Sequence, residues 1–298
     1  MRALTVILCA AVPAMFLAGC KGDAARKETP PPASQQVTAP PPAAPAPKAE
    51  APKPPPPPKE TPRAPGLVGH WKFDEKEGDA AVDSSGSGND GKLVGGPRRV
   101  AGKIGGALEF DGNDDVVEIP NSVTLENLQE GGYTIAAWVR PVDTPPGQES
   151  NNKAHYGIVN KAGWHTGLRY GNDNKFVFEH WIQTDKPDEP QWSGTGTWDD
   201  TYDPGKWYHV VGVVDAAAGT ATIFVNGESK NTSEAWDTKA KAREYGQTPW
   251  RIGYACPGAQ EWAWPAKAAI DDVRLYNRAL KDAEVEALYK AGAAGQDK

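Results

Sequence analysis

The stretch that decides the fold is Tyr133-Thr134-Ile135-Ala136-Ala137-Trp138-Val139. Successive side chains of a β-strand point to opposite faces of its sheet. One face of this stretch would carry a tyrosine, an isoleucine, an alanine and a valine, and the other a threonine, an alanine and a tryptophan. A strand that is apolar on both faces is typical of the middle of a sheet that is covered on both sides. The stretch therefore predicts a central strand.

Short β-rich runs separated by Gly, Asn and Asp lie on both sides of this stretch. They predict strands at 67–73, 107–110, 116–119, 134–140, 156–161, 175–181, 207–214, 220–225, 250–254 and 268–276. Asn226-Gly227 after a β-branched run is a hairpin-turn signal. One short helix is predicted over 279–289, with Gly292 just past its end. Many short strands with turn residues between them predict an all-β sandwich or jelly roll with a C-terminal helix.

The charge balance argues against nucleic-acid binding. The 298 residues carry 32 Lys and Arg against 39 Asp and Glu, for a net charge of −7. The first 65 residues are basic, with 8 positive and 4 negative side chains, so the remainder has a net charge of −11. Binding to nucleic acid depends on Lys and Arg that neutralise phosphates, and so the composition excludes polymerases, repressors and nucleases.

The start of the chain predicts export and a lipid anchor. An apolar run from Ala3 ends in Leu17-Ala18-Gly19-Cys20, which is similar to the lipobox of bacterial lipoproteins. That similarity implies a signal peptide over 1–20, acylation of Cys20 and attachment to a membrane of the bacterial cell envelope. Lys21 favours the outer membrane. The alternative is an ordinary secretory signal that is cleaved near Gly19.

Residues 21–65 hold 16 of the 28 prolines and predict a disordered linker. Prolines favour an extended polyproline II chain, so this linker would hold a domain over 66–298 clear of the bilayer. A ligand for proline-binding modules is the alternative. Cys256 would then be the one thiol of the exported domain, and an inert thiol is the simplest expectation for it.

Eight motifs in fixed order carry a resemblance to a known family. The chain resembles the laminin G-like members of the concanavalin A-like lectin/glucanase superfamily over most of 66–292. The resemblance implies a jelly roll of two curved antiparallel sheets, in which the first and last strands are neighbours. The connections at about 183–205 and 229–248 resemble insertions into that framework. The motifs are Trp71 to Glu75, Val82 to Gly86, Asn89 to Gly91, Gly106 to Gly112, Tyr133 to Val139, Trp207 to Val211, Gly219 to Gly227 and Ile270 to Leu280.

The sequence offers no catalytic constellation. Glucanases of this superfamily use Glu-x-Asp-x-Glu or a close variant on one strand, and that spacing is missing here. Glu179 and His180 are neighbours on a predicted strand, so they would face opposite ways. The five His show no zinc-binding spacing, and no G-x-S-x-G motif is present. We therefore expect a protein that is not an enzyme.

The resemblance also implies a structural Ca²⁺ ion, because relatives hold one through carboxylates from distant strands. Its candidate ligands here are Asp74, Asp83, Asp111 and Asp272. The stretch from Asp83 to Gly91 begins like an EF-hand loop, but Val94 stands where an EF-hand needs a bidentate Glu. The alternative is that these Asp side chains set turns before Gly.

All 11 tryptophans lie beyond residue 65. Those in the family motifs are expected in the core, whereas those on polar loops could stack on sugar rings. The predicted ligand-binding residues are Trp181, Trp192, Trp198, Trp236, Glu179 and Asn172. A loop that its own tryptophan pins to the sandwich is the alternative for each.

These features predict a lipid-anchored, non-catalytic, carbohydrate-binding module outside the cytoplasm. Its partners would be the membrane, through the lipid, and a glycan or a surface protein, and we expect a monomer. Two alternatives stay open: a module for protein adhesion or assembly, since laminin G-like domains serve both uses, and a divergent glycan-degrading enzyme.

Overall fold

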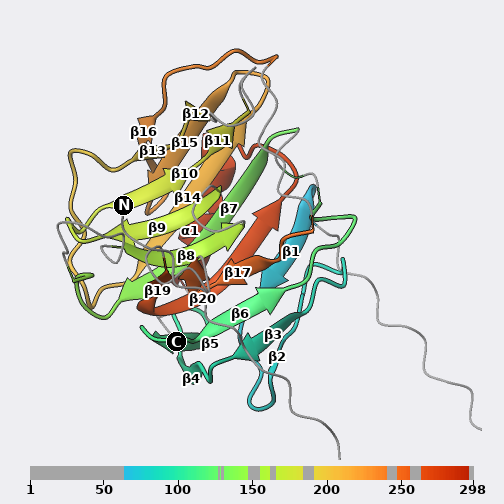
Figure 1. Ribbon diagram of the computed structural model, residues 1–298, viewed down its shortest axis with the longest axis vertical. Coiled ribbons are helices and arrows are strands. Elements are labelled where there is room, and N and C mark those ends of the chain that lie inside the picture. Colours follow the sequence, from blue (N-terminus) through green and yellow to red (C-terminus); the bar gives the residue numbers. More distant parts are fainter. Residues whose placement is uncertain are drawn as a thin grey trace, which may run out of the picture. The chain divides into compact units, whose positions relative to one another are not determined.

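Two antiparallel sheets of eight strands each form a β-sandwich in the computed structural model (Figure 1). The structure describes residues 64–126, 128, 131–146, 155–161, 166–183, 191–239, 247–255 and 263–294. The predictions for Cys20, Cys256, the signal peptide and the linker lie outside these residues. The jelly-roll fold predicted from the sequence is confirmed.

Sheet A contains the predicted central strand and both ends of the domain. Its strands are β1 (Leu67–Trp71), β4 (Arg98–Ala101), β5 (Gly106–Asp111), β7 (Tyr133–Pro141), β14 (Tyr208–Asp215), β15 (Thr220–Val225), β16 (Glu228–Thr232) and β20 (Lys267–Tyr276). They are ordered β16-β15-β14-β7-β20-β5-β4, and β1 pairs with β20 beside this path. The first strand therefore pairs with the last, as the resemblance implies, with Trp71 opposite Val273.

Sheet B faces sheet A across the core. Its strands are β2 (Ala80–Ala81), β3 (Gly91–Val94), β6 (Val116–Ile119), β8 (His155–Lys161), β9 (Thr166–Gly171), β10 (Phe176–Glu179), β13 (Thr195–Gly196) and β17 (Trp250–Ile252). Their order is β13-β10-β9-β8-β17-β6-β3-β2. Two hairpins, β11 (Trp181–Ile182) with β12 (Gln191–Trp192), and β18 (Tyr254–Ala255) with β19 (Trp264–Pro265), stand beside the sheets.

Strand β7 pairs along its length with β14 on one side and with β20 on the other, and all of its residues except Arg140 are buried. One face packs into the core between the sheets, where Ile135 and Val139 lie. The other face packs under a helix, where Ala136 and Val285 share a second apolar cluster. The prediction of a central strand that is covered on both sides is confirmed.

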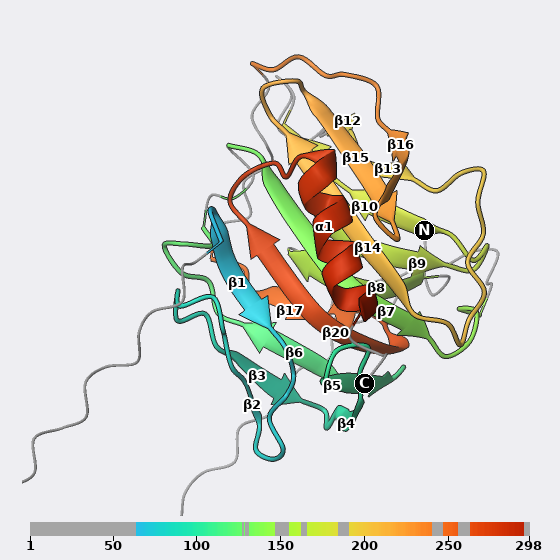
Figure 2. The ribbon, with the colours of Figure 1, turned by 180° about the vertical axis from the view of Figure 1, so that it is seen from behind.

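Helix α1 (Asp282–Ala293) lies across the outer face of sheet A, over β14, β7 and β20 (Figure 2). It begins three residues later than predicted because the backbone N–H of Leu280 donates to Thr134 Oγ1 at 3.0 Å, which ties the chain to the sheet. Glu284 accepts from the Lys281 N–H and pairs with Arg278, so it caps the first turn. Among the residues that the structure describes, no helix has the length and apolar character to span a membrane.

Candidate functional site

Two tryptophans form an exposed aromatic strip along the edge of sheet B. Trp192 is 40% exposed and Trp198 is 43% exposed, and every other tryptophan that the structure describes is buried or half-buried. The two ring centroids lie 6.4 Å apart, with 55° between the ring planes. We call these two side chains the aromatic strip. Large apolar groups are costly to leave in water, so an exposed pair of indoles indicates a binding surface.

The glycines of this segment make room for the indoles. A Cβ atom on Gly194 would lie 2.9 Å from Trp192 Nε1, and one on Gly196 would lie 2.6 Å from the Trp198 ring. Each indole therefore lies against the glycine backbone. Between and beside these glycines, Ser193, Thr195 and Thr197 are buried, as expected where side chains alternate between two faces.

Glu179 at the end of β10 supports the strip from beneath. It is only 4% exposed, and its Oε2 accepts a hydrogen bond of 2.5 Å from Trp192 Nε1. Its Oε1 accepts one of 2.6 Å from Arg169 Nε on the neighbouring strand β9. Arg169 and Glu179 form a buried ion pair, in which each charge is compensated by hydrogen bonds. Trp192 is thus held in place by a charged group.

His180 faces the other way, as the sequence predicts. Its Nδ1 lies 3.1 Å from Tyr133 Oη, and its ring lies 5.1 Å from that of Trp236. Burial lowers the pKa of His180 to about 4, so the ring is neutral at neutral pH. Glu179 and His180 therefore cannot act together on one ligand.

Arg169 links Glu179, which supports the strip, to His155 and Trp264. Its Nη1 lies 2.9 Å from His155 Nδ1, and its guanidinium carbon lies 5.7 Å from the centre of the Trp264 ring. The rings of His155 and Trp264 meet edge to face at 4.9 Å. Burial first, and the Arg169 charge second, lower the pKa of His155 to about 3. His155 is therefore a neutral acceptor for the guanidinium.

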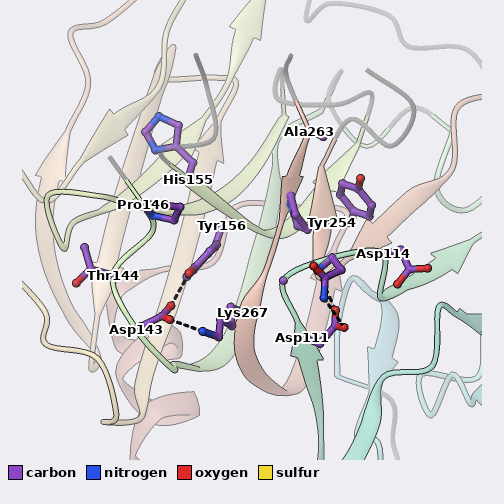
Figure 3. Close-up of a pocket in the computed structure, with 13 residues that line it drawn as sticks. Asp111, Asp114, Asp143, Thr144, Pro146, His155, Tyr156, Tyr254, Ala263 and Lys267 are labelled. Carbon is purple, nitrogen blue, oxygen red and sulfur yellow. Dashed lines mark hydrogen bonds and ion pairs between the residues drawn. The ribbon is translucent and has the colours of Figure 1, made fainter. Parts of the chain in front are cut away.

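His155 also lines a cavity of about 830 Å³ at one end of the sandwich (Figure 3). Tyr156 and Lys267 both point at Asp143 and each donates to one of its oxygens at 2.5 Å. Desolvation opposes ionisation of Asp143, but the hydrogen bonds from Lys267 and Tyr156 prevail and lower its pKa. The other lining residues are Asp111, Gly112, Asn113, Asp114, Thr144, Pro146, Tyr254, Ala263 and Pro265.

Asp111 and Asp114 of the cavity lining form an acidic group with the buried Asp115. Ligand atoms of Asp111, Asp114 and Asp115 lie within 4.8 Å of one another, and this is the one such group of three acidic, His or Cys residues among the described residues. The side chain and backbone of Asn113 donate to Asp111 and lower its pKa. Desolvation raises the pKa of Asp115, which is buried.

The structure brings together part of the predicted ligand-binding set. Glu179, Trp192 and Trp198 lie at the strip, and Trp181 is the cross-strand partner of Trp192 and is half-buried. Trp236 lies apart from these residues in its contacts, because it is half-buried, packs against the core and lies beside the His180 ring.

Asn172 lies apart from Glu179. It is exposed in the turn after β9, and the register of β9 with β10 places that turn at the opposite end of the hairpin from Glu179. Asn172 was predicted from its residue type, and its position relative to Glu179 depends on the strand register.

The four predicted calcium ligands do not form one set. Asp83 accepts from the backbone N–H groups of His70, Ser85 and Asn89. Asp272 lies 2.6 Å from His70 Nε2 and 3.0 Å from Arg274 Nη2. Protein donors therefore contact the carboxylate oxygens of both residues.

The other two predicted calcium ligands, Asp74 and Asp111, also accept hydrogen bonds from the protein. Asp74 Oδ1 accepts from the Gly106 N–H at 2.8 Å, and Asp111 belongs to the cavity wall. The turn at 102–106 also contacts Asp271, not Asp272, through the Ile104 N–H. Asp272 has a positive φ of 47° in a β-bulge, which changes the direction of its side chain. Calcium binding itself stays a prediction.

Sequence reasoning missed Arg169, His155, Asp143 and Lys267. Arg169 had a usable signal, because it stands between the apolar Leu168 and Tyr170 and so had to face away from the core. The others are brought together by contacts between distant segments, for which one sequence holds no local signal.

Solved structures show the same fold at low sequence identity. The binding domain of a Paraclostridial mosquitocidal protein matches with a TM-score of 0.54 and 16% identity over 76% of this chain and 52% of that one. Domain 4 of the extracellular arabinanase AbnA from Geobacillus stearothermophilus, in complex with arabinotriose, matches at 0.52 and 20%, over 75% and 98%. Trypanosoma rangeli sialidase matches at 0.53 and 18%, over 78% and 34%. The chain thus spans about half of the first protein and a third of the sialidase.

A comparison with curated protein sequences gives no match. A family model does match, over residues 111–286, and it is described as the concanavalin A-like lectin/glucanases superfamily. These residues hold the central strand, the aromatic strip and all of the cavity lining. The chain belongs to the concanavalin A-like lectin/glucanases superfamily.

Proposed function

We propose that this protein is a non-catalytic carbohydrate-binding module and that its glycan lies along the aromatic strip. The observation that carries the proposal is the pair of exposed indoles, Trp192 and Trp198, fixed over glycine backbone. A sugar ring has an apolar C–H face that packs on an indole and a rim of hydroxyls that needs hydrogen bonds. Glu179 and Arg169 lie beneath the strip and hold Trp192 in place.

Preorganisation supports binding at this place. The hydrogen bond from Trp192 Nε1 to Glu179, and the contact of Trp198 with Gly196, hold both rings before a ligand arrives. A rigid aromatic side chain loses little conformational freedom on binding, so more of the contact energy contributes to affinity.

The geometry around Glu179 supports a role in binding over one in hydrolysis. Glycosidases use two carboxyl groups that flank the scissile bond, one of them a protonated acid. Here both oxygens of Glu179 accept hydrogen bonds, one of them from a guanidinium. Both oxygens are therefore engaged within the protein, in holding Trp192 and Arg169.

The relatives support the same class. One similar structure is described as the binding domain of a toxin, and another is an arabinanase domain in complex with arabinotriose. The sialidase match spans only about a third of that enzyme.

We further propose that the domain is presented outside the cytoplasm, on a lipid at Cys20 and a proline-rich spacer over 21–65. Two acyl chains anchor a protein stably where one does not. A spacer of 45 residues reaches at most about 140 Å if fully extended as polyproline II. This would bring the strip to a glycan of the cell envelope or its surroundings.

A glycan array tests the proposed function, together with an assay for release of reducing ends from each glycan that binds. We expect binding to a restricted set of glycans, no release of reducing ends, and weaker binding for Trp192→Ala and Trp198→Ala. Val123→Ala is the matched control, because Val123 is 91% exposed and lies outside the strip and the cavity. Absence of binding, or release of reducing ends by the pure protein, would overturn the proposal.

A further inference from the structure

The cavity beside the strip extends the site. Trp192, Glu179, Arg169 and His155 form an unbroken series of contacting side chains, and His155 lines the cavity. The cavity is therefore linked to the strip through two side chains, Glu179 and Arg169, and is a second place where a sugar residue of the same glycan can bind.

The walls of the cavity match a sugar ring. Pro146, Ala263 and Pro265 give apolar wall, and Tyr156 and Tyr254 add aromatic surface. Polar groups stand at two sides: the Asp143–Lys267 pair with Tyr156 at one, and Asp111 with Asn113 at the other (Figure 3). A cavity of about 830 Å³ falls in the range of small-molecule sites.

The charges of the lining select among sugars. Asp111, Asp114 and Asp143 supply three carboxylates, and Lys267 supplies one ammonium, for a formal charge of −2. The Lys267 ammonium is 2.5 Å from Asp143 and so is compensated within the wall. His155 is neutral, and it adds no positive charge. An incoming carboxylate or sulfate would meet acceptors and like charge, whereas hydroxyls and amines would meet acceptors that they can donate to.

We propose that the cavity binds an uncharged or amine-bearing sugar residue of the glycan and rejects sugars that carry a carboxylate or a sulfate. This inference rests on the proposed function, since the cavity is a second position on the same oligosaccharide. The charge of the cavity lining determines which glycans bind. The aromatic strip adds stacking energy that does not depend on the charge of the glycan.

The test is a glycan array that contains neutral, amine-bearing, uronic-acid and sulfated oligosaccharides. It is probed with the wild-type protein, Asp114→Asn and Trp198→Ala at ionic strengths of about 0.05 M and about 0.5 M, where the Debye length falls from over 10 Å to a few Å. Asp114 is exposed at the cavity wall, and asparagine keeps its shape while removing its charge. Asp282→Asn, at the exposed start of α1, removes the same charge at a distant surface and is the control.

We expect binding to neutral and amine-bearing glycans and none to acidic ones. Asp114→Asn should lower the preference for amine-bearing over neutral glycans by about two- to fivefold at low salt, which corresponds to loss of one exposed charge pair. High salt should reduce the same preference, and Asp282→Asn should leave it unchanged. Trp198→Ala should weaken all glycans alike.

Binding of uronic-acid or sulfated glycans as tightly as neutral ones would overturn the inference and leave the proposed function intact. A preference that Asp114→Asn does not change would also overturn it. If no glycan binds at all, the proposed function fails, and the inference fails with it. Thermal melting of each variant confirms that a loss of binding does not come from loss of the fold.

Discussion

Replacing Asp271 by Asn should make the protein more stable at pH 8. Asp271 is fully buried, and its Oδ1 has no hydrogen-bond partner among the described residues. Burial raises its pKa from 3.8 to about 7, against the opposing hydrogen bond from the Ile104 N–H. Holding the carboxylate charged in the folded protein is therefore unfavourable.

The size and sign follow from this pKa. The folded protein binds the proton of Asp271 more tightly than the unfolded chain does, so the contribution to stability is complete below about pH 4 and is lost as the pH rises through about 7. A shift of about 3 units at about 1.4 kcal/mol per unit sets an upper limit of about 4 kcal/mol. Asparagine keeps an acceptor for the Ile104 N–H and carries no charge, so the variant should gain up to that amount on wild type between pH 4 and pH 8.

Urea denaturation followed by tryptophan fluorescence, with a chelator present, measures this difference at both pH values. Asp272→Asn is the matched control, because the neighbouring carboxylate pairs with His70 and Arg274. Removing its charge should destabilise the protein at pH 8, by about 3–5 kcal/mol for a broken buried pair. A difference between Asp271→Asn and wild type that stays the same at both pH values, or a variant that is less stable at pH 8, would refute the reasoning.

Three further predictions concern other parts of the molecule. Burial lowers the pKa of His180 to about 4, so its contribution to stability is present above pH 6.5 and is lost as the pH falls toward 4. His180→Asn should therefore lose less stability than wild type between pH 7 and pH 4.5 in urea titrations. An equal loss of stability in the two proteins would contradict this. Gly196→Val should displace the Trp198 ring and weaken glycan binding in a titration, whereas Gly131→Ala, where a Cβ meets open space, should not; equal affinities would contradict the placement of the ring. Cys20→Ser should leave an unprocessed or a soluble protein in detergent partitioning, and a processed variant that stays in the membrane fraction would mean that something other than acylation anchors it.

The parts of the fold that the sequence predicts are those with a local or a periodic signal. A continuous apolar run marks β7 because both of its faces are covered by protein, and Asn226-Gly227 marks the turn between β15 and β16. Several outer strands escaped prediction: β3 and β4 are short, and β16 carries mostly polar side chains that are not held in a core. Whether such a segment forms a strand depends on the strand that it pairs with, and less on its own composition.

The candidate site was predictable only in its residue types. Trp192, Trp198 and Glu179 were expected to bind ligand, and the structure places them together. Trp236 stands in a polar stretch of sequence, as Trp192 and Trp198 do. It nevertheless packs against the core, where its backbone N–H donates to the Gly219 carbonyl at the end of the β14–β15 turn. The direction of the Asp272 side chain could not be predicted from alternation, because a β-bulge between Asp271 and Arg274 breaks the alternation at this point.

The most direct test of the central claim is a calorimetric titration of the tightest glycan from the array into the wild-type protein and the double variant Trp192→Ala/Trp198→Ala. If the strip is the binding surface, the double variant should lose about fivefold to about 150-fold in affinity, since two stacked aromatic contacts of about 0.5–1.5 kcal/mol each are removed. Its melting temperature should stay close to that of wild type, because both rings are exposed and lie outside the core. An affinity equal to that of wild type would contradict the account and place the glycan elsewhere on the molecule.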